Sequence, residues 1–262
     1  MKTLHAHPLV TFRKIGLALG TIAMLAVAPA IVRAQASANT PDFTGVWGIY
    51  RGGKGADPKF APPAPSPLVL KPEYDKPYQA RRAEESAAAQ RGEQLASSGV
   101  QCIPYGVPSM MSIAIYPVEF IQTAKQVTII SEAFSEVRRV YLDRPQAKID
   151  DVAPGYYGRS VGHWDGDTLV VDTVGIKPAV SGYRGMPHSP QMHIVERIRM
   201  LSPEILHDQI TIEDPVVLEK PVTYTLAFKR MASDYEMVEF VCDNNREYVD
   251  DKGVVRLKLH DK

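Results

Sequence analysis

The sequence lacks three short motifs that mark common enzyme classes. It has no complete P-loop, no GxGxxG fingerprint and no CxxC pair. Each of these patterns supplies a defined chemistry, namely phosphate binding, dinucleotide binding and thiol redox exchange. Nucleotide-dependent and thiol-redox enzymes are therefore not favoured.

The sequence also has no excess of one charge and little uninterrupted hydrophobicity. An apolar run from Ile15 to Val32 stands out near the N-terminus, but two glycines and a proline break it. A lasting membrane span is the weaker interpretation, because spanning needs about 20 apolar residues. Basic residues precede the run, and Ala34-Gln35-Ala36 offers a small-x-small cleavage site. This pattern predicts a signal peptide at residues 1–36 and a periplasmic or secreted protein with no transmembrane anchor after cleavage.

The charge balance of the remaining chain argues against a nucleic-acid partner. Residues 1–36 contain four of the 30 basic residues and none of the 30 acidic ones, which leaves 26 (30 − 4) against 30. A formal charge near −4 does not suit a polyanion. The remaining 226 residues (262 − 36) are enough for one sizeable core, so we expect a single domain of unknown oligomeric state.

Cysteine is scarce, with Cys102 and Cys242 as the two examples. Export to an oxidising compartment makes a disulfide between them the default expectation. A bond of this kind would tie an early loop to the last strands.

Short stretches of alternating hydrophobicity predict an all-β fold. In Val222–Arg230, for example, Val222, Tyr224, Leu226 and Phe228 alternate with mostly polar residues. Nine or ten such stretches with short connections indicate an antiparallel, lipocalin-like β-barrel, with a two-sheet β-sandwich as the alternative. The expected strands of this series are 112–123, 126–132, 136–142, 160–164, 167–173, 192–201, 205–213, 222–230, 236–242 and 254–259, and a further strand is expected at 42–50.

Gly158–Thr173 is the most specific of these stretches. Asp165-Gly166 suits a two-residue type I′ turn, which requires positive φ at both central positions. We expect a β-hairpin in which Trp164 and Asp167 face each other.

A proline-rich segment interrupts the strand pattern. Residues 54–78 contain seven prolines that start at Pro58, and this composition predicts an extended arm on the surface. An alanine-rich helix is expected at 79–96, exposed or lying across a barrel end. The predicted organisation is a signal peptide (1–36), the first barrel strand (37–53), the arm and helix (54–100) and the rest of the barrel domain (101–262).

One expected strand, His193–Met200, combines apolar and ionisable residues. If its apolar set faces the barrel interior, Glu196 faces it too, and must be paired or have a raised pKa that suits acid/base catalysis. In the opposite register His193 and Arg197 enter the cavity as a base and an anion clamp. Glu196 and His193 are therefore catalytic candidates, and ordinary cross-strand ion pairs are the alternative.

Further candidates lie on the hairpin and on the following loop. Asp172 interrupts an apolar arm and is a third catalytic candidate, placed either at the barrel mouth or beside an arginine. The loop 182–190 is too long for a tight turn and suits substrate contact over a barrel mouth. The predicted substrate-binding residues are Arg197, Tyr183, His188, His163 and Trp164, and Arg184 belongs to the same loop.

No cofactor is expected. His188, His193 and Glu196 have spacings compatible with a metal site only if His163 or an aspartate joins them. No HxH or HExxH motif after residue 36 supports such a site.

Taken together, these segments resemble a family of exported bacterial proteins. The resemblance rests on the sequences GRSVGHWDGDTLVVDT, HSPQMHIVERIRM, ITIEDP and VCDNN, and extends to the opening at 42–47 and the run at 102–108. The family motif includes His193, Glu196, Arg197, Asp167, Asp172, Asp214 and both cysteines, but implies no particular activity. Arg159 departs from a histidine that is frequent in the family, so this chain would differ in activity if that histidine is catalytic. Separately, Gly45-Val46-Trp47 resembles the lipocalin GxW signature, whose tryptophan closes a barrel end.

Two main hypotheses of function follow. The first is a cofactor-free lyase, isomerase or hydrolase that acts on a small apolar or aromatic compound, with Glu196 or His193 as acid/base and Arg197 or Tyr183 orienting the substrate. The alternative is a lipocalin-like carrier of a hydrophobic ligand without catalysis, because the same barrel serves both uses. A third possibility is an envelope protein whose proline-rich arm docks a partner.

Overall fold

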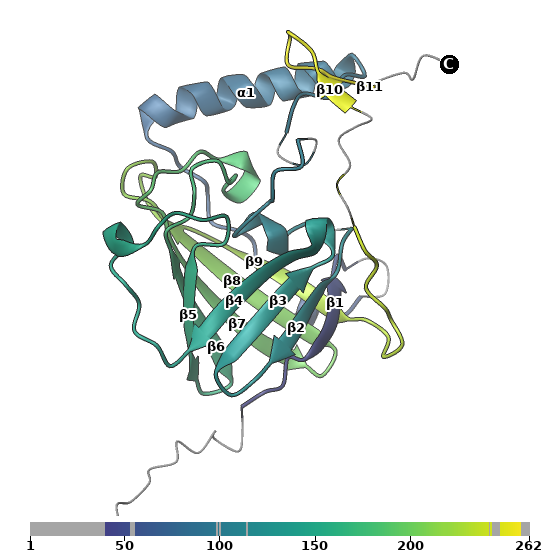
Figure 1. Cartoon of the computed structure of the whole chain (residues 1–262), viewed down its shortest axis with the longest axis vertical. Coiled ribbons are helices and arrows are strands. Elements are labelled where there is room, and N and C mark those ends of the chain that lie inside the picture. Colours follow the sequence, from purple (N-terminus) through teal and green to yellow (C-terminus); the bar gives the residue numbers. More distant parts are fainter. Residues whose placement is uncertain are drawn as a thin grey trace, which may run out of the picture. The chain divides into compact units, whose positions relative to one another are not determined.

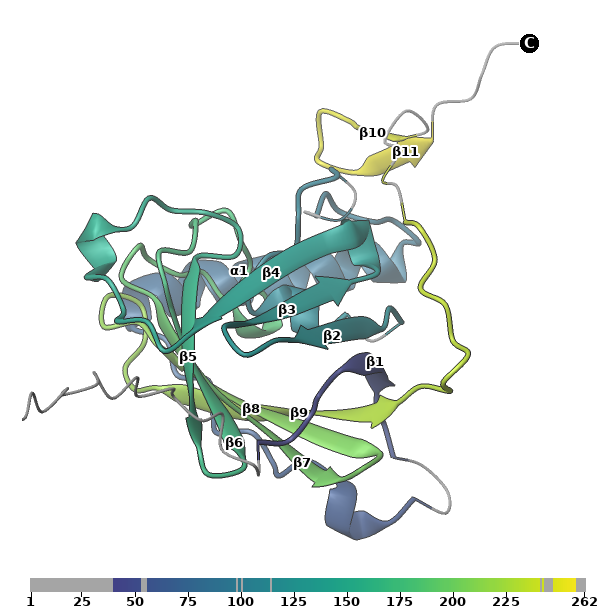
Figure 2. The ribbon, with the colours of Figure 1, turned by 60° about the horizontal axis from the view of Figure 1, so that its bottom comes forward.

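Nine strands close into one barrel in the computed structural model of this protein (Figures 1 and 2). The structure describes residues 40–52, 56–97, 99, 101–113, 115–240, 242 and 247–257, so the predicted signal peptide lies outside the described residues. The barrel strands are β1 (Gly45–Ile49), β2 (Val118–Gln122), β3 (Gln126–Ser131), β4 (Glu136–Leu142), β5 (Arg159–Asp165), β6 (Thr168–Val174), β7 (His193–Ser202), β8 (Ile205–Glu213) and β9 (Val222–Arg230).

The remaining elements are a helix, a C-terminal strand pair and five short turns. They are α1 (Pro72–Gln90), β10 (Glu247–Val249), β11 (Val255–Leu257) and the 3-10 turns η1 (Pro58–Phe60), η2 (Ser109–Met111), η3 (Ala133–Ser135), η4 (Ile149–Asp151) and η5 (Tyr183–Gly185). The predicted β-barrel is confirmed, and all described residues belong to one compact unit.

The barrel departs from the predicted all-antiparallel order at one pair of neighbours. β4 and β5 run parallel, with Val140 opposite Ser160, while the other eight neighbouring pairs are antiparallel. An odd number of strands cannot alternate in direction all the way around a closed ring. The connection 143–158 therefore crosses from one end of the barrel to the other.

The β5–β6 hairpin forms with a turn one residue later than predicted. Asp165 pairs with Thr168 and Trp164 with Leu169, so the two turn residues are Gly166 and Asp167. Only Gly166 has positive φ (63°). A glycine at the first central position is typical of a type II′ turn, so the predicted type I′ turn and the facing of Trp164 and Asp167 are wrong.

Helix α1 begins seven residues before the predicted start and lies across one end of the barrel (Figure 1). Pro72 occupies the first turn, where a proline costs no hydrogen bond. The earlier start adds Tyr74 and Tyr78, which pack against the barrel core. The helix ends at Gln90, before Gly92 with a φ of 72°, and not at the predicted Ser97–Gly99 stop.

The proline-rich arm runs along the outside of the barrel, as predicted. Its Ser66 N–H donates to the carbonyl of Thr223 on β9, and Leu70 bridges to Leu218 in the connection between β8 and β9. These contacts hold the arm against the barrel at two positions.

Two predicted strands are wrong or shortened. Residues 236–240 form no strand, because β9 already pairs with β8 and β1 and the closed sheet has no free edge. The stretch predicted at 112–123 becomes a strand only from Val118, directly after Pro117, which lacks a ladder donor.

Trp47 on β1 is part of the buried core. The indole is fully buried, its Nε1 donates to the carbonyl of Phe43 at 2.9 Å, and Arg230 lies 4.1 Å from the ring. The role that the GxW resemblance implies for this tryptophan, closing a barrel end, stays a prediction.

A disulfide joins the two cysteines, as predicted. The Cys102 and Cys242 sulfurs are 2.08 Å apart, which ties the segment before η2 to the C-terminal segment. Among the described residues, none of the helices has the length and apolar character to cross a membrane.

Candidate functional site

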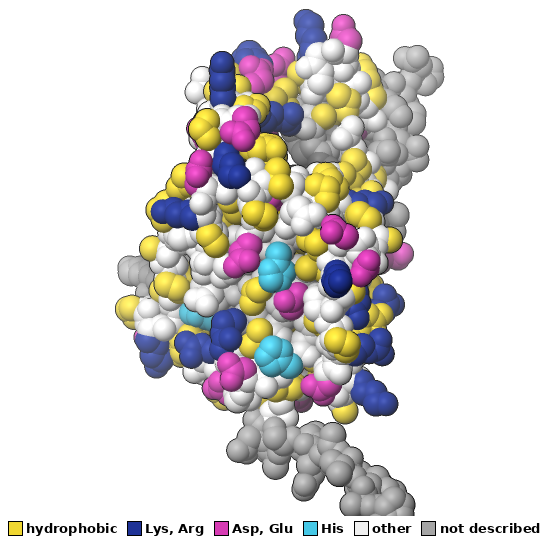
Figure 3. All heavy atoms as spheres, turned by 90° about the vertical axis from the view of Figure 1, so that its left-hand side faces the viewer, with side chains coloured by type: hydrophobic (Ala, Val, Ile, Leu, Met, Phe, Trp, Pro, Cys, Tyr) yellow, Lys and Arg dark blue, Asp and Glu magenta, His cyan; other side chains and the backbone are white. Residues whose placement is uncertain are grey.

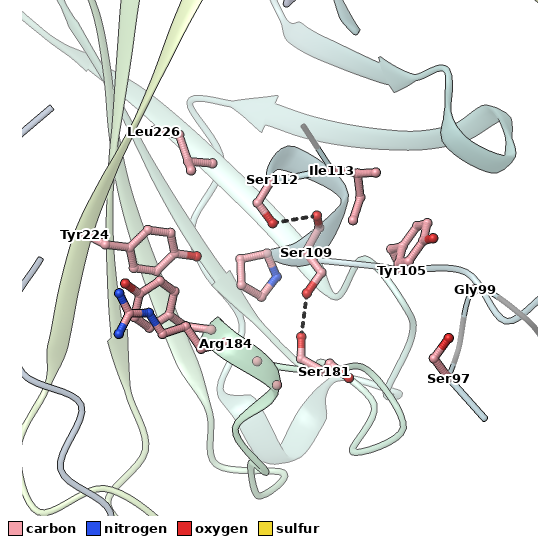
Figure 4. Close-up of a pocket in the computed structure, with 14 residues that line it drawn as sticks. Ser97, Gly99, Tyr105, Ser109, Ser112, Ile113, Ser181, Arg184, Tyr224 and Leu226 are labelled. Atoms are coloured by element: carbon pink, nitrogen blue, oxygen red, sulfur yellow. Dashed lines mark hydrogen bonds between the residues drawn. The ribbon is translucent and has the colours of Figure 1, made fainter. Parts of the chain in front are cut away.

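A cavity of about 380 Å³ lies at the α1 end of the barrel (Figure 4). Its walls come from the segment around η2, the loop around η5 and the inner face of β9. The side chains that matter below are Tyr105, Ser112, Tyr183, Arg184, Tyr224 and Leu226. Aromatic rings with a few hydroxyl groups and one arginine are typical of a site for a small organic molecule.

A buried carboxylate from β4 fixes one wall of this cavity. The two oxygens of Glu136 accept the backbone N–H groups of Tyr105 and Gly106 at 2.7 and 2.8 Å. Burial raises the pKa of Glu136, although these bonds and one from Tyr157 oppose the shift. Gly106 is required here, because its φ is 65° and a Cβ would lie 2.4 Å from the carbonyl oxygen of Tyr156.

Tyr224 and Tyr183 form a stacked pair in the cavity. Their ring centroids are 4.1 Å apart with an interplanar angle of 16°. Tyr224 comes from the inward face of β9, and Figure 4 shows its hydroxyl group directed toward the side of the cavity where Ser109 and Ser112 lie. Within the described part of the chain, this hydroxyl has no hydrogen-bond partner, which leaves it free to bind a ligand.

Deeper in the barrel, a buried ion pair joins β4 to β7. Arg138 donates from Nη1 to Glu196 Oε1 at 2.8 Å and from Nη2 to Oε2, and both side chains are fully buried. Nε and Nη2 also donate to Ser160 and Thr173, at 3.1 and 2.9 Å. Burial opposes the charge of Arg138, but attraction to Glu196 outweighs it and raises the arginine pKa. The pair is fully hydrogen bonded, as a buried ion pair must be.

Asp208 on β8 is a second buried acid in the barrel interior, and its hydrogen-bonding groups are not satisfied. It is fully buried, and neither carboxyl oxygen has a hydrogen-bond partner among the described residues. Burial and the charge of Glu196 hold its pKa well above the ordinary range, with Arg138 acting in the opposite direction. Asp208 therefore keeps its proton to higher pH than an ordinary aspartate.

These acids act on Tyr224 through space. Asp208 lies two residues from Ile210, which pairs with Tyr224. Burial, then Asp208, Glu196 and Tyr183, raise the pKa of Tyr224 well above its usual value of about 10. The phenol is therefore a protonated donor inside the cavity at neutral pH.

The register of β7 is the one that places Glu196 inside. Ile194, Glu196 and Ile198 are buried, while His193 and Arg197 point outward. His193 bonds Asp172 through Nε2 at 2.9 Å and lies 3.5 Å from Glu213 through Nδ1. Figure 3 shows histidine and acidic side chains next to each other on the side of the barrel. The predicted catalytic residues are thus divided between the interior (Glu196) and the outer surface (His193 and Asp172).

The outer cluster leads to a prediction about pH. The hydrogen bond to Asp172 raises the pKa of His193 above its ordinary value of about 6.5, although burial opposes this. We expect NMR titration to show that Asp172→Asn lowers this pKa more than Asp167→Asn does.

The same pKa shift affects the stability of the folded protein. When folding raises the pKa of a group, the resulting stabilisation is fully present below the group's ordinary pKa and is lost as the pH rises through the raised pKa. His193→Gln should therefore cost under about 1 kcal/mol at acidic pH and less in alkali. A His193 pKa in the wild type equal to the ordinary histidine value would contradict both predictions.

Of the predicted substrate-binding residues, Tyr183 lies in the cavity and the others lie elsewhere. His163 is exposed on the outer face of β5, and Trp164 packs on Phe43 with ring centroids 5.3 Å apart. His188 is buried, with Nδ1 near the carbonyl of Ser189. Arg197 pairs with Asp165 at 2.9 Å on the surface, beside a hollow shared with Arg199 and His207.

The metal set considered from the sequence is not brought together. Glu196 and His193 lie on opposite faces of β7. Within the described ranges, no group of three or more His, Cys, Asp or Glu side chains is arranged to hold a metal.

Ser160 is at the centre of a sequence, Gly158-Arg159-Ser160-Val161-Gly162, that matches the GxSxG pattern of serine hydrolases. In those enzymes the serine occupies a sharp strand-to-helix turn. Here it lies within β5 and bonds Arg138 and Thr173. The match therefore carries no nucleophile.

Sequence reasoning did not single out Arg138, Asp208 or Tyr224. A signal was present for Asp208, because it shares the apolar face of β8 with Leu206, Ile210 and Ile212. Arg138 gave no signal of this kind. Because Arg139 follows it directly, the sequence does not show which of the two arginines points inward.

No model of a known protein family matches the chain, and no curated protein matches it.

Proposed function

We propose that this protein is a small-molecule enzyme of the acid/base type, a lyase, isomerase or hydrolase without an organic cofactor. Its substrate is a small apolar or aromatic compound bound in the cavity at the α1 end. The cavity offers stacked tyrosine rings for such a compound and a free phenol for its polar group.

One observation carries this proposal, which is the placement of Tyr224. Its hydroxyl lies in the cavity and bonds none of the described residues, and its pKa is raised by burial and by two buried acids, Asp208 and Glu196. A protonated phenol beside a carboxyl group of raised pKa is an arrangement that donates hydrogen bonds to a developing oxyanion. In this proposal Tyr224 gives a proton or a strong hydrogen bond to a substrate oxygen, Asp208 supports it, and Tyr183 orients the ring by stacking.

A carrier without catalysis is the second candidate, and a specific observation favours it. Arg138 neutralises Glu196 with two hydrogen bonds, so this carboxylate is not a free base. An apolar barrel with its buried arginine and glutamate paired serves binding equally well.

We also propose that the protein is periplasmic or secreted. The disulfide between Cys102 and Cys242 supports this location, because such bonds persist in oxidising compartments.

Blocking the cavity tests the proposal. Ser112 lines the cavity and is exposed to it, so Ser112→Trp should fill the space. Ligand-observed NMR with a library of small aromatic compounds should find at least one binder, and the variant should weaken its binding more than about tenfold, or about 1.4 kcal/mol. Binders would then be screened for conversion by mass spectrometry.

The matched control is Glu204→Trp in the β7–β8 turn, outside the cavity lining. It should bind like the wild type. If no compound binds, or if Ser112→Trp binds equally well, the proposed site is wrong.

A further inference from the structure

The entrance of the cavity carries more positive than negative charge. Arg184 lines both the cavity and a neighbouring hollow of about 360 Å³, which Arg81, Arg82 and Glu85 also line. Glu85 pairs with both helix arginines, at 2.8 and 3.0 Å. Three guanidinium groups therefore face one carboxylate, and a positive rim of this kind attracts small anions.

Arg184 forms no ion pair with the described residues. No acidic oxygen of these residues lies within 4.0 Å of its guanidinium, which lies over the ring of Tyr183, 5.1 Å from the centroid. Tyr183 in turn stacks on Tyr224. Figure 4 shows the guanidinium of Arg184 on the same side of the cavity as the ring of Tyr224. A cation in contact with the aromatic pair is thus left for a ligand to neutralise.

The backbone at Arg184 is held in an unfavourable conformation. Its φ is 55°, in the left-handed region that a residue with a side chain rarely adopts. Bonds from Met186 N to the carbonyl of Tyr183, and from the Tyr78 hydroxyl of α1 to the carbonyl of Arg184 at 3.1 Å, maintain it. Strained residues of this kind cluster at ligand clamps, where the surrounding structure fixes them.

The interior of the barrel offers a bound anion no comparable cation among the described residues. Arg138, the buried arginine, is already paired with Glu196, whereas Arg184 lines the cavity. A bound anion would therefore keep its charged group at Arg184 and direct the rest of the molecule toward the phenol.

We infer that the cavity takes a small aromatic carboxylate, with the carboxylate on Arg184 and the ring against Tyr183 and Tyr224. This inference rests on the proposed function and narrows its substrate class. Arginine suits this task because its planar fork binds a carboxylate through two hydrogen bonds.

Isosteric pairs of probes test the inference. Benzoate and benzamide form one pair, and 2-naphthoate and 2-naphthamide form a larger one, so that ring size does not decide the result. By calorimetry, each carboxylate should bind the wild type about 10–100-fold more tightly than its amide, the range expected for a charge-assisted hydrogen bond. Arg184→Gln should remove that preference, and Arg184→Lys should restore part of it.

The control is Arg82→Gln, which removes a rim arginine that does not line the cavity and should keep most of the preference. If the amides bind as tightly as the carboxylates, or if Arg184→Gln keeps the preference, the inference is wrong while the proposed cavity stands. If none of the four probes nor any other small aromatic compound binds, the inference and the proposed function both fail.

Discussion

Replacing Arg138 with Met is expected to lower the free energy of unfolding by about 3–5 kcal/mol. The substitution removes the partner of Glu196, which is fully buried, and leaves a second acid, Asp208, in the same interior. A buried charge has lost its hydration, and without its partner no interaction within the protein compensates for that loss. Urea denaturation followed by circular dichroism measures the effect.

A double variant separates the ion pair from the packing. Arg138→Met with Glu196→Leu removes both charges at similar volume, and apolar replacements of buried pairs are often neutral. We expect the double variant to recover most of the lost stability, so the two substitutions should be strongly non-additive.

An exposed arginine on β7 provides the comparison. Arg197 pairs with Asp165 at 2.9 Å, but the two side chains are 46% and 61% exposed. Arg197→Met should therefore cost less than about 1 kcal/mol. If Arg138→Met lowers the free energy of unfolding no more than Arg197→Met does, the buried pair of Arg138 and Glu196 does not have the effect on stability that its burial implies.

The barrel walls could be predicted because alternation in the sequence reports the inward face directly. The bounds of β4, β8 and β9 match the predictions. β8 and β9 show a clear period of two in the sequence, whereas the inward face of β4 combines Glu136 and Arg138 with Val140 and Leu142. The parallel pairing of β4 and β5 could not be predicted, because it follows from the total number of strands and not from either strand.

Local signals were less reliable at the ends of elements. The Asp165-Gly166 dipeptide suggested one turn, but pairing of Asp165 with Thr168 extends the strands and moves the turn by one residue. The prolines of α1 suggested an arm, although Pro72 in the first turn is compatible with a helix that Tyr74 and Tyr78 anchor to the core.

The candidate site was harder to predict than the fold, because its residues are distant in sequence. Arg138 and Glu196 are 58 residues apart and meet only across the closed barrel. The sequence offered two registers for β7, and the apolar partners of Glu196 decide between them by burial. Tyr224 resembled an ordinary inward residue of β9, and only the cavity beside it marks it as a site.

Replacing Tyr224 with Phe is expected to lower kcat for an identified substrate by about 10²–10⁴-fold, the usual contribution of a general acid. The substitution removes one hydroxyl, which bonds no described residue, and keeps the ring that stacks on Tyr183. KM and the free energy of unfolding should therefore change little. Steady-state kinetics, with ligand binding measured separately, test this.

Tyr183→Phe is the matched control, because it removes a hydroxyl from the same stacked pair. If Tyr224 is the proton donor, this control should keep most of kcat. Equal losses in the two variants would assign the effect to the pair as a binding surface and not to the phenol of Tyr224.

The pH profile gives an independent check on the same residue. A general acid must be protonated, so activity that depends on Tyr224 is lost as pH rises through its pKa. That pKa is raised by burial and by Asp208 and Glu196, so wild-type kcat should show no loss from this group up to about pH 10. A carrier predicts a different result, in which Tyr224→Phe leaves binding unchanged and no compound that binds is converted by either protein. Turnover that survives Tyr224→Phe undiminished would exclude the phenol as the acid, and would move the search for a proton donor to Asp208.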